Sequence, residues 1–155
     1  MSGPGPLKIC LVCSSGGHFF EMQTLGPVWE TRPHFWVTNR DEDTAFALRD
    51  ENVVWAYQPT IRSLDNLIRN FRLAWKTLRR ERPGLIISTG AGVSVPFIYA
   101  GRILGIRSIF LESMTRVSDL SLSAKLAYPV VDRLLVQWPE ASDRYRKAEY
   151  RGRIL

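Results

Sequence analysis

The sequence has no long hydrophobic run. No stretch approaches the ~20 apolar residues that a membrane-spanning helix needs, and the opening residues, rich in glycine and proline, lack the apolar core of a signal peptide. We therefore expect residues 1–6 to be a flexible leader on a chain that is soluble or peripheral to a membrane. With 155 residues and a 45% apolar composition, residues 7–155 can bury the core of a single domain.

Cysteine is almost absent as well. Cys10 and Cys13 are the only two, and their C-x-x-C spacing could mark a redox pair or half of a metal site. Both lie in the apolar run Leu7–Cys13, however, and residues three apart on a strand point to opposite faces of a sheet. We expect two buried free thiols, which suit a reducing compartment. Because no other cluster of metal-ligating residues is evident, we expect neither a metal nor a cofactor.

Acidic residues are outnumbered: 15 Asp and Glu face 21 Lys and Arg, for a net charge of +6. An anionic partner is therefore expected: nucleic acid, an acidic membrane surface or a phosphorylated substrate. The sequence has no recognised nucleic-acid-binding motif and no aromatic stacking platform, which disfavours nucleic acid.

The strongest helical pattern covers Leu64–Arg82, with Ser63 as the N-cap and Pro83-Gly84 as the stop. An apolar stripe predicts its core-facing side: Leu64, Leu67, Ile68, Phe71, Trp75 and Leu78. A basic flank runs beside the stripe: Arg69, Arg72, Lys76, Arg79 and Arg80. This flank is either a solvated face or a contact with acidic lipid head groups.

Short β-rich runs alternate with helical segments along the chain. Strands are predicted over Leu7–Cys13, Phe35–Thr38, Val53–Tyr57, Leu85–Ser88, Ser108–Leu111 and Leu134–Val136. The other helices are predicted over His18–Leu25, Asp43–Arg49, Pro96–Leu104, Leu120–Tyr128 and Glu140–Lys147. This order predicts an α/β fold with a parallel sheet and helices on both faces, in which ligands bind beyond the carboxyl ends of the strands.

Two loops rich in glycine follow strands of this sheet. The first contains Ser14, Ser15, Gly16 and Gly17, and the second contains Gly90 and Gly92. Each precedes a helix, where bare backbone N–H groups and the helix dipole favour an anion, so the two loops could hold the two phosphates of one pyrophosphate. The first loop matches neither the Rossmann G-x-G-x-x-G nor the ATP-binding P-loop, which disfavours NAD and ATP. Its alternative role is a tight strand-to-helix turn.

Three polar residues near these loops are candidates for proton transfer. His18 follows the glycines directly, and the ordinary histidine pKa of about 6.5 suits a base near neutrality. Glu21 lies one helical turn further on and could orient or charge the imidazole, or could be a solvated carboxylate. Glu112 ends the fifth strand and could serve as a base or bind sugar hydroxyls, or could hydrogen-bond the loop backbone instead. His34 has no evident partner, and we expect it in a surface loop.

Taken in order, the motifs resemble one half of a split glycosyltransferase. They are Ser14-Ser15-Gly16-Gly17-His18 with Glu21-Met22, Gly90-Ala91-Gly92-Val93, Glu112-Ser113 with Arg116-Val117, Tyr128-Pro129 and Gln137-Trp138-Pro139. Over nearly its whole length the chain is similar to the membrane-associated subunit of the two-chain N-acetylglucosaminyltransferase that extends a dolichol-pyrophosphate-linked sugar. It also resembles bacterial PssD-type exopolysaccharide subunits. The resemblance implies a Rossmann-like doubly wound sheet, the N-terminal half of a GT-B glycosyltransferase.

The resemblance also implies a function. The protein would bind a polyprenyl-pyrophosphate-linked sugar at the cytoplasmic face of the membrane and would be active only with a separate donor-binding subunit that holds a UDP-sugar. The alternative is a non-catalytic subunit that recruits a catalytic donor-binding partner to the membrane.

The resemblance assigns roles to the residues singled out above. The acceptor pyrophosphate would be held by Ser14, Ser15, Gly16, Gly17, Gly90 and Gly92, and the catalytic residues would be His18 and Glu112. The cleft and the partner contact would comprise Glu21, Ser113, Arg116, Gln137, Trp138 and Pro139. The membrane would be met by the basic flank and by Phe97, in an apolar patch over Pro96–Tyr99.

Overall fold

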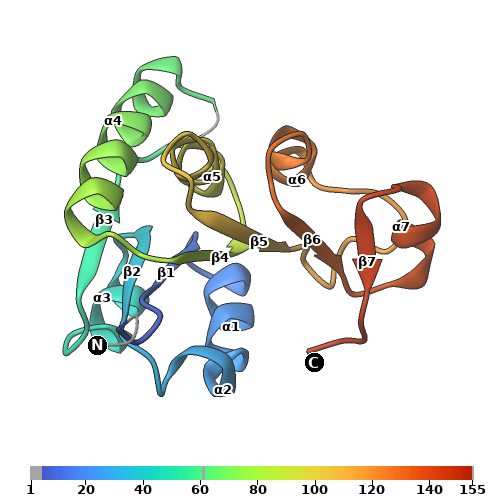
Figure 1. The fold of residues 1–155 in the computed structure, drawn as a ribbon, viewed down its shortest axis with the longest axis horizontal. Helices are drawn as coiled ribbons and strands as arrows, with labels where there is room; N and C mark the ends of the chain where they lie inside the picture. Colours follow the sequence, from blue (N-terminus) through green and yellow to red (C-terminus); the bar gives the residue numbers. More distant parts are fainter. Residues whose placement is uncertain (1–4, 61, 155) are drawn as a thin grey trace.

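The computed structural model describes residues 5–60 and 62–154, and seven strands of these residues form one parallel sheet (Figure 1). In chain order they are β1 (Ile9–Cys13), β2 (His34–Asn39), β3 (Val53–Ala56), β4 (Leu85–Gly90), β5 (Arg107–Leu111), β6 (Arg133–Val136) and β7 (Ala148–Tyr150). In space the order is β3-β2-β1-β4-β5-β6-β7, and every neighbouring pair is parallel. The predicted parallel α/β sheet is confirmed.

Helices cover both faces of this sheet. They are α1 (Gly17–Thr24), α2 (Gly26–Trp29), α3 (Glu42–Ala47), α4 (Leu64–Glu81), α5 (Ser94–Ile103), α6 (Leu122–Ala127) and α7 (Pro139–Arg144). In Figure 1, α4, α5 and α6 lie above the sheet, and α1 and α2 lie below it. The sequence prediction missed α2 and β7, because four and three residues are too few to show a periodic pattern. Residues 1–4 of the predicted leader lie outside the described residues.

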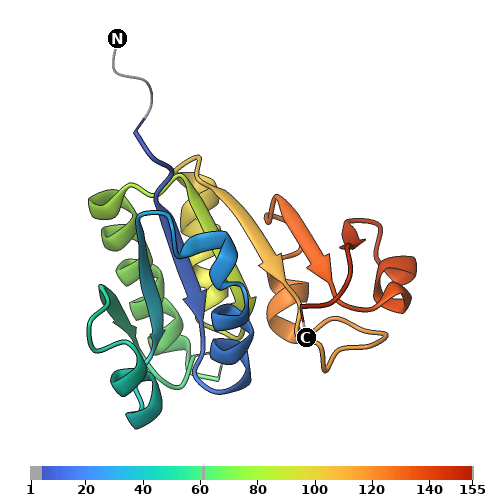
Figure 2. The ribbon, with the colours of Figure 1, turned by 90° about the horizontal axis from the view of Figure 1, so that it is seen from below.

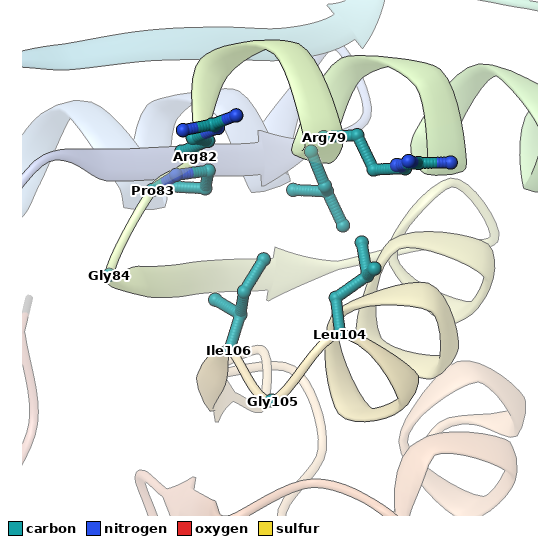
Figure 3. A pocket seen from close by; sticks show the side chains of 8 residues that line it. Arg79, Arg82, Pro83, Gly84, Leu104, Gly105 and Ile106 are labelled. Carbon is teal, nitrogen blue, oxygen red and sulfur yellow. The ribbon is translucent and has the colours of Figure 1, made fainter.

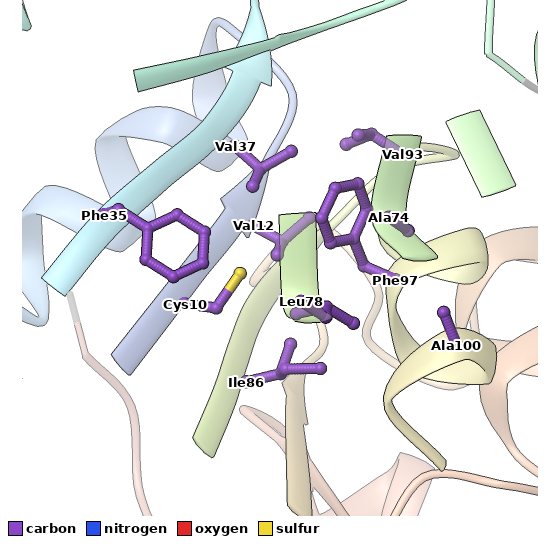
Figure 4. Packing of buried hydrophobic residues seen from close by; sticks show 10 residues of the cluster. All are labelled: Cys10, Val12, Phe35, Val37, Ala74, Leu78, Ile86, Val93, Phe97 and Ala100. Atoms are coloured by element: carbon purple, nitrogen blue, oxygen red, sulfur yellow. The ribbon is translucent and has the colours of Figure 1, made fainter. Parts of the chain in front are cut away.

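The core has a layer on each side of the sheet, and the two cysteines lie in different layers. One cluster packs β1, β2 and β4 against α4 and α5 (Figure 4), with the sulfur of Cys10 pointing in among its side chains. Cys13 packs in the cluster on the opposite face, beside Phe19 of α1. Both thiols are free and buried, as predicted. Burial raises the pKa of Cys10 well above its ordinary value and that of Cys13 to about 12.

Helix α4 buries only part of the apolar stripe predicted to face the core: Leu78 is buried, and Phe71 and Trp75 pack partly buried against the core cluster. Ser63 does cap it, accepting a hydrogen bond from the Asn66 N–H. The buried residues, however, are Asn70, Ala74, Thr77 and Leu78, whereas Leu64 is 72% exposed and Ile68 is 44% exposed. The Asn70 amide is satisfied by the backbone of Tyr57, so a polar residue can occupy the buried side. The first half of the apolar stripe is therefore turned towards α5 and the surface.

His34 corrects a second prediction. It begins β2 instead of lying in a surface loop, and it packs edge-on against Trp29. Its Nδ1 lies 2.7 Å from the Arg32 carbonyl oxygen and its Nε2 lies 3.2 Å from the Glu51 carboxylate. Glu51 lies 17 residues further along the chain, so the sequence alone did not reveal this partner.

The strand order reverses direction between β1 and β4. From β1 the chain builds outward through β2 and β3, and it then returns to add β4 on the other side of β1. Figure 2 shows β1, β5 and β6 running in the same direction, so their carboxyl ends share one edge. Such a reversal leaves a crevice at the carboxyl ends of the two central strands, and this is where open α/β sheets bind ligands.

Candidate functional site

The loop after β1 presents open backbone at this crevice. Gly16 has a φ of 77° and is the N-cap of α1, which has no side-chain cap and no acidic residue in its first turn. A Cβ atom added at Gly16 or Gly17 would meet nothing within 4 Å, so the space above both glycines is free. The first-turn N–H groups of α1 thus face open space where a negative charge is favourable. Ser14 and Ser15 lie half-buried beside it.

His18 joins this loop to the loop after β4. Its Nδ1 lies 2.8 Å from the Thr89 carbonyl oxygen, and the Thr89 hydroxyl donates to the His18 carbonyl at 2.6 Å. A carbonyl oxygen can only accept, so Nδ1 carries the proton and the neutral ring keeps its lone pair on Nε2. The imidazole is therefore fixed in the tautomer that a base acting through Nε2 requires.

Gly90 makes room for that imidazole. Its φ is 120°, and a Cβ atom there would lie 3.0 Å from both Cε1 and Nδ1 of His18. Its N–H donates to the Ser88 hydroxyl and its carbonyl accepts from the Ser94 hydroxyl. This corrects the prediction that the Gly90 N–H donates a hydrogen bond to the bound anion, because that N–H already donates to Ser88 inside the loop. Ala91 is left-handed, with a φ of 71°, and Gly92 is buried.

Glu21 is buried beside His18, which excludes the solvated alternative. It is 3% exposed, and its Oε2 lies 3.8 Å from His18 Nδ1. This neighbouring carboxylate, the Thr89 carbonyl and the Glu112 charge raise the pKa of His18 above its ordinary value, against the lowering effect of burial. The arrangement makes His18 a stronger base than an isolated histidine.

The other oxygen of Glu21 holds the loop after β5. Oε1 accepts from the Ser113 hydroxyl at 3.1 Å and from the Met114 N–H at 2.9 Å. Among the described residues, Oε2 has no hydrogen-bond partner. Glu21 therefore links His18 to a loop more than 90 residues away along the chain.

Glu112 braces the same loop. It is 1% exposed, and its two carboxylate oxygens accept from the Ser113 N–H at 2.9 Å and the Ser121 N–H at 2.6 Å. This is the structural alternative considered from the sequence, and burial keeps both oxygens away from solvent. Glu112 therefore holds the loop in place, and its direct catalytic role stays a prediction. Arg116, in the same loop, is exposed.

The residues after β6 extend this network. Gln137 is fully buried, donating to the Glu112 carbonyl and accepting from the Ile154 N–H. The Trp138 indole N–H donates to the Met114 carbonyl at 2.6 Å, and the Arg153 guanidinium lies 3.7 Å from the centre of the indole ring. Pro139 is exposed at the start of α7. Gln137 therefore has no surface for a partner, contrary to the prediction, whereas Trp138 and Pro139 reach the surface.

Four loops thus meet at one edge of the sheet, as the sequence predicted. Thr89 and Ser94 are the residues of this edge that sequence reasoning missed. Thr89 directly precedes Gly90 at the end of a strand, and that position was the available signal. Three or more His, Cys, Asp or Glu side chains placed to hold a metal ion are not found among residues 5–60 and 62–154.

The expected membrane residues divide into two groups. The five basic residues of α4 are exposed, and Arg80 is paired with Glu81 at 2.8 Å. Phe97 is 0% exposed in the cluster of Figure 4, and Pro96 and Ile98 are buried too. The predicted apolar patch over Pro96–Tyr99 is wrong for Phe97 and Ile98, which pack into the core, whereas Pro96 and Tyr99 line a surface hollow. In the part of the chain that the structure describes, no helix is both long and apolar enough to cross a bilayer.

A separate hollow of about 410 Å³ lies at the opposite edge of the sheet (Figure 3). It is formed where α4 passes into β4 and α5 passes into β5, with Arg79 and Arg82 on its wall. The amino ends of the strands lie here, so this hollow is remote from the glycine loops.

Comparisons with known proteins agree on one family. The model of the family described as "Oligosaccharide biosynthesis protein Alg14 like" matches residues 53–154. The "UDP-N-acetylglucosamine transferase subunit ALG14" of Eremothecium gossypii is 29% identical in an alignment of 184 positions, gaps included, that covers 99% of this chain and 82% of that protein. The protein of the same name from Homo sapiens is 29% identical over 181 residues, covering 96% and 83%.

Solved structures show the fold. Acinetobacter baumannii MurG superposes with a TM-score of 0.77 at 14% identity, covering 94% of this chain and 45% of MurG. The UDP complex of Staphylococcus aureus MnaA superposes with a TM-score of 0.74 at 12% identity, covering 96% and 45%. The chain therefore spans less than half of these structures, and its sheet is one Rossmann-like half of a GT-B fold.

Proposed function

Because the chain belongs to the Alg14-like family of oligosaccharide biosynthesis proteins, we propose that it is the acceptor-binding subunit of a two-chain glycosyltransferase. Its curated relatives are named as subunits of a UDP-N-acetylglucosamine transferase, which supports the same donor here and a partner chain that binds it. The acceptor is a sugar on a polyprenyl pyrophosphate, and residues 7–155 act as one acceptor-binding domain.

The fixed tautomer of His18 carries this proposal. Its Nδ1 proton is held by the Thr89 carbonyl, so the Nε2 lone pair is available to take the proton of an acceptor hydroxyl. The hydroxyl oxygen attacks the anomeric carbon of the donor sugar, and UDP leaves with the electrons of the bond that joined it to that carbon. Glu21 stabilises the imidazolium that results, because its buried carboxylate lies 3.8 Å from the ring. The open N–H groups at Gly16, Gly17 and the first turn of α1 bind the acceptor pyrophosphate next to this base.

Exposed basic residues support a position at the cytoplasmic membrane face. Arg69, Arg72 and Lys76 follow one line along α4 and surround a shallow hollow beside Tyr57. Basic residues near an acidic bilayer contribute about 1 kcal/mol each. This flank holds the subunit at the surface where its lipid-linked acceptor resides.

The test is sugar transfer by the reconstituted pair. Radiolabelled UDP-N-acetylglucosamine is supplied with a polyprenyl-pyrophosphate sugar and with this chain, the donor-binding chain, or both; transfer is expected only with both. His18→Asn keeps an N–H that can donate to the Thr89 carbonyl but removes the titrating nitrogen, so kcat should fall about 100-fold or more. His34→Ala, which changes the other histidine, is the control and should leave kcat unchanged. Full kcat in His18→Asn would favour the non-catalytic recruiter.

A further inference from the structure

An apolar trough runs between α4 and α5 on the face of the molecule that carries the basic flank. Its upper part, about 380 Å³, is walled by Leu67, Ile68 and Phe71 of α4 and by Val95, Pro96 and Tyr99 of α5. A lower part, about 410 Å³, continues past Phe71 and Arg72 to Trp75 and Ile103. Phe71 and Arg72 line both parts, so the two hollows form one trough. It is the displaced apolar stripe of α4 that forms its wall.

The trough begins beside the glycine loops. Val95 and Pro96 lie in the first turn of α5, and the loop with Gly90 and Ala91 directly precedes that turn. The N-terminal halves of α4 and α5 both lie at the carboxyl edge of the sheet, because α4 follows β3 and α5 follows β4. The open backbone at Gly16 and Gly17 is joined to this loop through the hydrogen bonds between His18 and Thr89, so the anion cradle and the end of the apolar channel lie on two loops that contact each other.

This juxtaposition defines the ligand chemistry. The wall of the channel has two charged residues, Arg72 and Lys76, and is otherwise almost wholly apolar, so it disfavours a polar chain, because unpaired polar groups would be costly there. A flat bilayer surface would contact protruding residues such as Leu64, not the half-buried Leu67 and Phe71 at the bottom of the trough. The volume is in the range of small-molecule sites.

We infer that the trough binds the first isoprene units of the acceptor, the hydrocarbon joined directly to the pyrophosphate. This inference rests on the proposed function, since it assigns the lipid tail of the same acceptor. The exposed basic residues beside the trough complement the pyrophosphate and the acidic head groups around it. The protein thereby binds the acceptor on both sides of the bond between the pyrophosphate and the first isoprene unit. Its affinity for the acceptor then comes from direct contacts with the lipid as well as from binding to the bilayer.

The test measures binding to the isolated chain by calorimetry, without vesicles. The probes are inorganic pyrophosphate, isopentenyl pyrophosphate and farnesyl pyrophosphate, which share the anion and differ in hydrocarbon length. Farnesyl pyrophosphate should bind at least about tenfold more tightly than pyrophosphate, because each buried CH₂ group adds affinity. Equal affinity for the three probes, or no binding of farnesyl pyrophosphate, would overturn the inference.

Two exposed residues of α4 provide a matched pair of variants. Ile68→Asn places an amide in the trough wall and should abolish the preference for farnesyl pyrophosphate while pyrophosphate binding stays unchanged. Leu64→Asn makes the same change four residues earlier, at a position that does not line the trough, and should preserve the preference. Ile68→Trp, which fills the channel, should act like Ile68→Asn.

Vesicle flotation separates this role from simple membrane contact. If Ile68→Asn lowered binding to phosphatidylglycerol vesicles but left the farnesyl preference intact, the trough would be a bilayer contact and the inference would fail. Failure of the proposed function has a different signature: no sugar transfer by the pair, whatever the tail preference of this chain.

Discussion

Replacing Gly90 with alanine tests the contact that joins the two glycine loops. An alanine with a φ of 120° is strained by about 1–3 kcal/mol. Its Cβ atom would also lie 3.0 Å from two atoms of the imidazole, so the ring must shift, and we expect that shift to break its hydrogen bond to the Thr89 carbonyl. A lost hydrogen bond costs about 0.5–1.5 kcal/mol. We expect Gly90→Ala to lower the free energy of unfolding by about 2–4 kcal/mol, which most domains of this size survive.

Urea unfolding measures the loss, and Gly16→Ala is the matched control. Gly16 also has a positive φ, 77°, with a ψ of −135°, but a Cβ atom there meets nothing within 4 Å, so the cost should be only the backbone strain of about 1–3 kcal/mol. When His18 is already replaced by alanine, Gly90→Ala should lower the free energy of unfolding by less, because no imidazole remains for the new Cβ atom to contact. The pKa of His18, followed by NMR, should fall in Gly90→Ala because the Thr89 carbonyl no longer supports the proton. Equal destabilisation by both alanines, with an unchanged His18 titration, would refute the contact.

Three further changes test the network and the surface. Glu21→Gln removes the charge beside the imidazole and should lower the pKa of His18 in an NMR titration. Because the pKa of His18 is raised in the folded state, the ion pair with Glu21 contributes its full stabilisation of the fold below the unfolded pKa of about 6.5. This contribution is lost as pH rises through the folded pKa, so Glu21→Gln should lower the free energy of unfolding more in acid than at alkaline pH. Equal losses at both pH values would contradict the ion pair. Glu112→Gln leaves a buried N–H without an acceptor and should cost about 1–3 kcal/mol in urea unfolding, with faster amide exchange in the loop after β5; unchanged exchange would count against the bracing role. Arg69→Gln with Lys76→Gln should weaken binding to acidic vesicles about 30-fold in flotation and leave neutral vesicles unaffected; undiminished binding would exclude the flank as a membrane contact.

The sheet and its ligand edge could be predicted from the sequence because their signals are local. The apolar run ending at Cys13 predicts a buried strand, and the glycines that follow predict a turn and a helix start. Parallel strands share a carboxyl edge, so the meeting of the loops follows from strand alternation alone.

The pairings within that edge could not be predicted in the same way. His18 meets Thr89 across 71 residues, and Glu21 meets Ser113 across 92, which depends on β1 lying next to β4 and on how the loop after β5 folds back. Likewise, apolar spacing locates a stripe on α4 but does not say whether that stripe faces the sheet or the neighbouring helix. Phe97 was misplaced for the same reason, since a run of four apolar residues in a helix does not identify its buried side.

The two thiols, one in each layer of the core, give the protein a pair of internal reporters. With their pKa raised by burial, neither Cys10 nor Cys13 offers a thiolate to an alkylating reagent in the folded state. Labelling therefore counts opening events, and the sulfur that is labelled identifies the layer that opened: the α4 and α5 side for Cys10, the α1 side for Cys13. The two native cysteines can thus show which side of the sheet opens more often in each variant above, and no engineered labelling site is needed.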